Sequence, residues 1–260
     1  MTALPAVAVV IPALNEAASI GRVLADLPPV GLVVVCDNGS TDGTAALARA
    51  AGATVVPAPR RGYGAACLAG LAYLAALPTP PEVVVFLDAD YSDHPDELPL
   101  LARPVLDGAA DLVIGSRVAL AAPGALLPQA RWGNRLACAL MRLRWGARFT
   151  DLGPFRAIRY GALARLGMTD EAFGWTVEMQ VRALRAGLRC AEVPVRYRRR
   201  VGVSKITGTV RGTVLAGATI LATIGRFALR RTSRAALPVQ NLTRPDLASG
   251  DFRAIRETRP

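Results

Sequence analysis

The stretch VVVFLDADYSDHP, residues 83–95, joins an apolar run to a cluster of acids. Its first residues are β-branched, aromatic or otherwise apolar, which predicts a buried strand. Asp88, Asp90 and Asp93 follow at the point where that strand would reach solvent. Because carboxylates this close repel one another, the cluster predicts a cationic partner that offsets the repulsion.

Around this stretch, short β-branched runs alternate with Ala-rich helical stretches. Strands are expected at residues 6–12, 32–37, 53–57 and 82–88, and helices at 15–27, 40–52 and 62–77. This alternation predicts an α/β, Rossmann-like fold in which a mostly parallel central sheet carries helices on both faces. Ligands of such sheets bind at the carboxyl ends of strands. The acidic loops that follow two of these strands should therefore line one crevice.

The second half of the chain is strongly basic. Residues 1–100 hold four Arg against ten Asp and Glu, whereas residues 101–260 hold 27 Lys and Arg against ten acids. Such a surplus favours nucleic acid, an anionic membrane or a phosphorylated substrate as partner. Nucleic acid is disfavoured because the basic half contains no recognition motif and the acids line the expected crevice.

The chain divides by composition into three parts. We expect a catalytic domain over residues 1–211, an apolar and basic helix over 212–231 that could contact a membrane, and a flexible tail over 232–260. The uncharged core of that helix, 212–225, is shorter than the roughly 20 residues that span a bilayer. The first apolar run lacks a basic region before it and is interpreted as a strand, not a signal peptide.

The four cysteines are spread along the chain without a CxxC pair. Three of them lie in apolar surroundings, which is typical of reduced core residues in a cytosolic protein. A cytoplasmic location follows as the expectation.

The acidic cluster itself admits several interpretations. An EF-hand loop is excluded because Asp93 stands where the obligatory Gly belongs, and a glycosidase carboxylate pair stays open. Asp93 is predicted to cap the helix that starts near Pro95. Asp88 and Asp90 suit a hard divalent cation, which prefers oxygen ligands and keeps substrate phosphates in its shell.

The neighbouring motifs decide between these interpretations. VVIPALNE, VCDNGSTDGT, RRGYGAACLAG, LDADYSDHP and IGSR occur in this order over residues 9–117. With them, the chain resembles the GT-A glycosyltransferases of family 2, and among these the polyprenyl- or dolichyl-phosphate mannose and glucose synthases. The resemblance covers about residues 6–211. TDLGPFRAIR, GWTVEMQ and GVSK, within residues 150–205, look like the acceptor-side segments of that branch.

The resemblance implies a nucleotide-sugar site near the N-terminus. The residues expected to frame the nucleotide are Pro12, Leu14, Asn15 and Glu16, with Asp37 and Asn38 facing the base and Gly64 allowing close backbone approach. Asp88 is expected to bind the ribose or the metal. Asp90 is expected to ligate Mg²⁺ or Mn²⁺ on the diphosphate.

The resemblance also implies a catalytic and acceptor side. Positions expected to meet a phosphate of donor or acceptor are Arg117, Arg131, Ser204 and Lys205, and Glu178 matches an acidic position near the transferred sugar. The expected catalytic set is thus Asp90, Arg117, Arg131, Glu178 and Lys205. Within the basic run 196–200, a phosphate-binding role is also expected.

Two departures from the family pattern bear on these roles. Family members usually carry Asp-Asp where this chain has Asp37 and Asn38, and an amide donates as well as accepts. Many relatives have Gln where Ser92 stands, so a metal contact there would run through water.

Together these features predict a metal-dependent, inverting transfer of a hexose from a nucleotide sugar of the GDP-mannose or UDP-glucose type to a polyprenyl phosphate, in cell-envelope biosynthesis. The alternatives are a hydroxyl acceptor, with Asp151 or Glu178 as general base, and a non-catalytic nucleotide-sugar-binding protein. The helix over 131–148 mixes Trp, Leu and Arg, which favours peripheral contact with the cytoplasmic face of a membrane.

Overall fold

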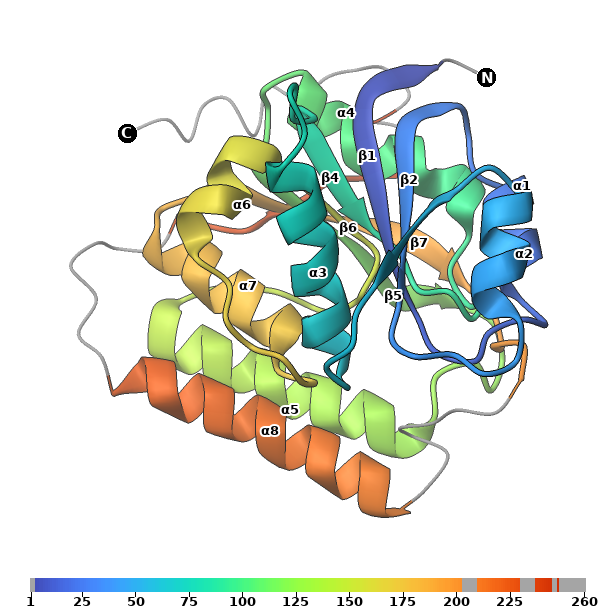
Figure 1. Cartoon of the computed structure of the whole chain (residues 1–260). Coiled ribbons are helices and arrows are strands. Elements are labelled where there is room, and N and C mark those ends of the chain that lie inside the picture. The colour runs from blue at the N-terminus through green and yellow to red at the C-terminus, as the bar shows by residue number, and fades with distance from the viewer. Residues whose placement is uncertain (1–2, 203–209, 230–236, 245–246, 248–260) are drawn as a thin grey trace.

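The computed structural model describes residues 3–202, 210–229, 237–244 and 247, which form one sheet with helices on both faces (Figure 1). The strands are β1 (Leu4–Ala13), β2 (Val30–Asp37), β3 (Thr54–Pro57), β4 (Val83–Phe86), β5 (Leu112–Ala121), β6 (Arg156–Arg159), β7 (Cys190–Tyr197) and β8 (Gln240–Asn241). Their order across the sheet is β3-β2-β1-β4-β6-β5-β7-β8. The strands predicted in the first hundred residues are confirmed, with boundaries shifted by a few residues.

The sheet is mostly parallel, as predicted. Among the strands of the described residues, only β6 runs antiparallel, and it does so to both of its neighbours, β4 and β5. This four-residue strand joins the N-terminal parallel group to the parallel β5–β7 pair. The carboxyl ends of β1, β2 and β4 consequently meet at one edge of the sheet, and β5 and β7 end beside them.

The helices form two layers. They are α1 (Ile20–Ala25), α2 (Thr44–Ala50), α3 (Tyr63–Ala75), the 3₁₀ turn η1 (Pro95–Glu97), α4 (Leu98–Leu106), α5 (Pro128–Trp145), α6 (Tyr160–Leu166), α7 (Trp175–Arg185) and α8 (Val210–Ala228). In Figure 1, α3, α6 and α7 cover one face of the sheet, and α5 and α8 lie side by side beyond them. Helices α1, α2 and α4 pack on the other face.

Alternation along β1 shows how one strand serves both layers. Ala8 and Val10 join the core beneath α3, whereas Val7, Val9 and Ile11 join the core beneath α1 and α4. Successive side chains of a strand point to opposite faces, so a continuous apolar run is what a sheet covered on both sides requires.

The four cysteines are all buried and free, as the sequence predicts. Burial raises the pKa of the Cys36 thiol to about 12 and that of Cys138 also to about 12. Thiols held protonated in this way are poor nucleophiles and behave as small apolar side chains.

Part of the expected tail, residues 237–244, lies within the described ranges. Strand β8 pairs in parallel with β7, and the Leu242 side chain is buried. Arg244 forms an ion pair with the buried carboxylate of Glu97.

Candidate active site

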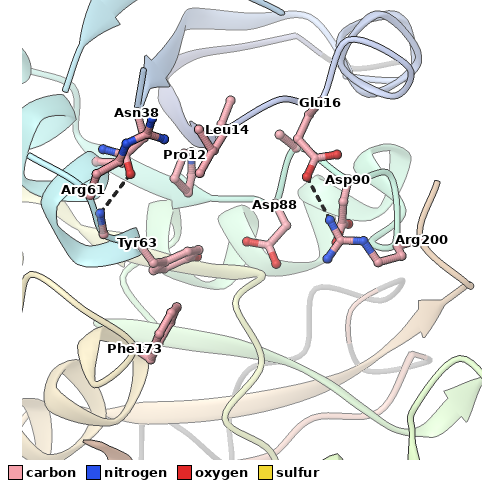
Figure 2. Close-up of a pocket in the computed structure, with 14 residues that line it drawn as sticks. Pro12, Leu14, Glu16, Asn38, Arg61, Tyr63, Asp88, Asp90, Phe173 and Arg200 are labelled. Atoms are coloured by element: carbon pink, nitrogen blue, oxygen red, sulfur yellow. Dashed lines mark hydrogen bonds and ion pairs between the residues drawn. The ribbon is translucent and has the colours of Figure 1, made fainter. Parts of the chain in front are cut away.

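Two adjoining cavities open at the carboxyl ends of the strands. The first, here called the strand-end cavity, has a volume of about 260 Å³, and its lining includes Pro12, Leu14, Glu16, Asn38, Asp88 and Asp90 (Figure 2). The second, here called the basic cavity, has a volume of about 620 Å³, and its lining includes Arg117, Arg131, Arg135, Asp151 and Arg199. Asp90 and Arg200 line both. Two ligands could therefore meet at Asp90.

Arg200 is the cation that the acidic cluster required. Its Nη1 lies 3.2 Å from Oδ2 of Asp90, and its Nη2 lies 2.8 Å from Oε1 of Glu16. The other oxygen of Asp90 accepts from the backbone N–H of Ser92 at 2.9 Å and from its hydroxyl at 2.5 Å. Ser92 is fully buried and so positions Asp90 from behind.

Asp88 and Asp93 reduce the repulsion in a second way, by favouring the protonated form. Burial, followed by the charge of Asp90, raises the pKa of Asp88 to about 7. Its Oδ1 is buried and has no hydrogen-bond partner within the described ranges. Burial, followed by the charge of Asp88, also raises the pKa of Asp93 well above its usual range.

Asp93 is not a helix cap, which corrects the sequence prediction. The residue before η1 is His94, and no side chain caps that turn. Asp93 is instead 1% exposed, its backbone bridges to Tyr197 at the end of β7, and neither carboxylate oxygen has a partner among the described residues. The local pattern resembled a capped helix start because Pro95 and the acids after it do occupy the first turn.

Of the residues expected to frame a nucleotide, four line the strand-end cavity and two support its rim. Asn15 Oδ1 accepts the Thr41 N–H at 2.8 Å, and Asp37 Oδ1 accepts the Ser40 N–H at 3.1 Å. Asn15 and Asp37 thus order the loop after β2 and are not part of the cavity lining. Pro12, Leu14, Glu16 and Asn38 are the four that line it.

Asn38 lines the cavity, but its amide is engaged with the protein backbone. Its Nδ2 donates to the carbonyls of Ala58 at 2.8 Å and Arg60 at 2.5 Å, and its Oδ1 accepts the Gly62 N–H at 2.9 Å. A carboxylate cannot donate to two carbonyls. An amide at position 38 therefore satisfies three backbone groups that an aspartate could not satisfy together.

Asn38→Asp should accordingly destabilise the fold and weaken nucleotide binding together. The substitution removes both donors and places a charge against two carbonyl oxygens, at a cost of about 1–3 kcal/mol. Urea unfolding and titration with UDP or GDP measure the two effects. The same substitution at exposed Asn241 should change neither, and an Asn38→Asp protein as stable as the wild type would contradict the bonding described here.

Gly64 does not line the cavity, in contrast to the expectation of close approach to a nucleotide. A Cβ atom there would lie 2.0 Å from the carbonyl oxygen of Asp170. The Gly64 N–H also donates to the carbonyl of Ala172 at 3.1 Å. The close approach is to protein backbone, while Gly62 and Tyr63 of the same turn reach the cavity.

In the basic cavity, Arg117 is locked to Asp151. Its Nε and Nη2 donate to the two carboxylate oxygens at 2.8 and 2.7 Å, and its backbone N–H donates at 2.8 Å. Asp151 is 1% exposed. Because both oxygens accept from Arg117, the contacts of Asp151 give no support to the general-base alternative for this residue.

Three further arginines of the basic cavity remain available for an anion. Within the described part of the chain, Arg131, Arg135 and Arg199 have no acidic partner. Arg131 and Arg135 stand in the first two turns of α5, whose amino end adds a partial positive charge. Of the sequence expectations for this side, Ser204 and Lys205 lie outside the described residues.

Glu178 lies away from both cavities, which corrects its expected catalytic role. It is fully buried in α7 and accepts hydrogen bonds from Thr169, Asp170 and Arg182. Its carboxylate is therefore occupied by the protein, and the alternative role as general base is excluded by the same contacts.

Sequence reasoning missed several cavity residues. Phe173 lines the strand-end cavity from a loop without a recognisable motif, and Arg61 and Tyr63 reach it from the Gly-rich turn. Arg199 and Arg200 belonged to a basic run whose members could not be told apart. The path of the chain after β7 shows which arginines of this run, Arg199 and Arg200, face the cavities.

No group of three or more His, Cys, Asp or Glu side chains converges as a metal site in the described ranges. A cation at Asp88 and Asp90 would therefore take its other ligands from substrate or water. The unpartnered Oδ1 of Asp88 and the cavity-lining carboxylate of Asp90 fit that demand.

Comparison with solved structures defines the class of the fold. Glucosyl-3-phosphoglycerate synthase of Mycobacterium tuberculosis, crystallised with Mg²⁺ and UDP, superposes with a TM-score of 0.67 at 26% identity, over 87% of this chain and 80% of that one. The chain has the GT-A glycosyltransferase fold, as predicted.

Sequence comparison then places the protein. The family model for glycosyl transferase family 2 matches residues 8–167, and the chain belongs to this family. An uncharacterized glycosyltransferase of M. tuberculosis is 43% identical, over 81% of this chain and 94% of that protein. Undecaprenyl-phosphate mannosyltransferase of Micrococcus luteus is 34% identical, over 81% of this chain and 91% of that protein. The protein is thus a glycosyltransferase enzyme.

Proposed function

We propose that the enzyme transfers a hexose from a nucleotide sugar to the phosphate of a polyprenyl phosphate, with inversion and with Mg²⁺ or Mn²⁺ as cofactor. The observation that carries this proposal is the basic cavity, which Asp90 also lines and where Arg131, Arg135 and Arg199 have no acidic partner among the described residues. The relative from M. luteus, an undecaprenyl-phosphate mannosyltransferase, supports the same acceptor class.

The donor would bind in the strand-end cavity. Pro12, Leu14 and Asn38 lie at the end away from Arg200 and suit a nucleoside, while Asp88 and Asp90 would hold the metal on the diphosphate (Figure 2). The metal, when bound, neutralises the charge that develops on the departing nucleoside diphosphate. Arg200 lines both cavities and can pair with phosphate oxygens once its contacts with Glu16 and Asp90 exchange.

The acceptor would bind in the basic cavity. A phosphate is already an anion at neutral pH and needs no general base, whereas a hydroxyl does. Both acids that line this cavity, Asp90 and Asp151, are held by arginines. The amino end of α5 and its arginines can instead position an anionic nucleophile against the donor sugar.

The test is sugar transfer with defined donors and acceptors. Purified protein with Mn²⁺ is incubated with radiolabelled GDP-mannose, UDP-glucose or UDP-GlcNAc, with and without undecaprenyl phosphate. We expect label to enter the lipid fraction with one donor only, and to depend on the lipid phosphate. Transfer to undecaprenol, or to 3-phosphoglycerate but not to the lipid, would overturn the acceptor assignment.

The outer face of α5 suits the surface of an anionic bilayer, where such an acceptor resides. Trp132 and Leu143 are 68% and 85% exposed, and their spacing of eleven residues puts them on one side of the helix, three turns apart. Arg135 and Arg142 are exposed beside this stripe. Among the described residues, no helix combines the length and apolar character needed to cross a membrane.

Vesicle flotation tests this contact. At low salt the protein should float with phosphatidylglycerol vesicles but not with phosphatidylcholine vesicles, because the arginines need anionic headgroups. Trp132→Ala with Leu143→Ala should reduce the floated fraction severalfold, by removing apolar area that enters the interface. Leu47→Ala, at an exposed position on α2, is the control. A wholly soluble wild type would refute the membrane contact.

A further inference from the structure

We propose that Glu178 is a positioning residue that fixes residues 169–174, here called the wall loop, as one side of the strand-end cavity and thereby sets nucleotide affinity. The inference rests on the proposed nucleotide-sugar site. It gives a use to a buried carboxylate that touches neither cavity.

Glu178 holds the first two residues of the wall loop from behind. Its Oε2 accepts the N–H groups of Thr169 at 3.1 Å and Asp170 at 2.7 Å, and its Oε1 accepts the Thr169 hydroxyl at 2.8 Å. Arg182, one turn further along α7, donates Nε to the same Oε1 at 2.9 Å. All four bonds need an acceptor, which only the ionised carboxylate supplies at both oxygens.

The wall loop in turn packs directly on the turn that starts α3. The Ala65 N–H donates to the Glu171 carbonyl at 2.9 Å, and the Gly64 N–H donates to the Ala172 carbonyl at 3.1 Å. A Cβ atom on Gly62 would lie 2.1 Å from the Glu171 carbonyl oxygen. No space is left between the two backbones, so a shift of the wall loop would also displace the turn at the start of α3.

Both partners of this contact face the cavity. Phe173 of the wall loop and Tyr63 of the turn lie beside each other on the lining (Figure 2). At the outer edge, the Arg60 guanidinium pairs with Glu171. Glu178 is the buried end of this assembly, and Phe173 is its cavity end.

The charge of Glu178 is maintained by its donors. Burial alone would raise the pKa of Glu178, but the hydrogen bonds from Asp170, Thr169 and Arg182 lower it below its usual value. In Glu178→Gln an amide N–H₂ must replace one acceptor oxygen and would face N–H or O–H donors. The wall loop then loses part of its anchor while the side-chain volume is kept.

The experiment measures binding of UDP and of GDP, each with Mn²⁺, by calorimetry, alongside thermal unfolding. Glu178→Gln should raise the Kd of each nucleotide about tenfold, as expected when a cavity wall is displaced. Phe173→Ala should weaken it similarly with little loss of stability. Thr169→Val, which removes one donor to Glu178, should give about a threefold loss and covers the case in which Glu178→Gln does not fold.

Glu97→Gln is the matched control. Glu97 is likewise buried and accepts a backbone N–H at 2.8 Å and an arginine Nε at 2.5 Å, both from Arg196, yet it lines neither cavity. It should lower the unfolding temperature and leave nucleotide affinity unchanged. Equal affinity in wild type, Glu178→Gln and Thr169→Val would overturn the inference alone. A wild type that binds neither nucleotide would overturn the proposed function as well.

Discussion

Asp90→Ala should abolish sugar transfer, with a fall in kcat/KM of about a thousandfold or more, because it removes the proposed metal ligand, which is also the carboxylate shared by both cavities. Asp90 is the acid at which donor and acceptor would meet. The measurement is label transfer over a range of Mn²⁺ concentrations. Added Mn²⁺ should not restore transfer by the variant. Wild type that has been treated with EDTA should regain full transfer when Mn²⁺ is added back.

Two companion variants make that result specific. Asp107→Ala removes an exposed acid at the end of α4, away from both cavities, and should transfer at the wild-type rate. Asp90→Ala leaves the buried N–H and hydroxyl of Ser92 without their acceptor, so its unfolding temperature should fall moderately, and transfer is measured at a temperature where the variant is folded. Unimpaired transfer by Asp90→Ala would refute the metal role.

The sequence predicted the part of this site that follows from parallel strands. The loops after β2 and β4 were expected to line one crevice, and Asn38, Asp88 and Asp90 of those loops do line the strand-end cavity. Glu16 was expected there from the family resemblance. The order of the remaining strands could not be predicted. Nothing local in the four residues of β6 indicates that they run antiparallel between β4 and β5.

The residues that were misassigned are those whose partners are distant in sequence. Asp93 has the local pattern of a cap, but β7 covers it through Tyr197. Glu178 has the local pattern of an acid at a helix start, yet its carboxylate turns inward to the wall loop. Local patterns fix the secondary structure, whereas burial and pairing are set by tertiary contacts that a short motif does not contain.

Asp151→Asn should lower the free energy of unfolding by about 2–3 kcal/mol, because it leaves the Arg117 guanidinium, whose side chain is only 15% exposed, without its counter-ion. Asp151 is 1% exposed. Its carboxylate oxygens accept three hydrogen bonds from Arg117, each with a donor–acceptor distance of 2.8 Å or less. An amide cannot neutralise the guanidinium. Transfer should also fall, since Arg117 lines the basic cavity and would lose its fixed orientation.

A double-mutant cycle separates the charge from the shape of this pair. Arg117→Met combined with Asp151→Asn should regain much of the lost stability, because no unpaired charge remains, but should not regain transfer. Asp111→Asn is the control, since Asp111 pairs with Arg189 at 2.9 Å but its side chain is 18% exposed, against 2% for that of Asp151. Water can replace a lost partner there, so the loss should be smaller. Equal losses at Asp111 and Asp151 would show that burial does not set the strength of the Arg117 pair.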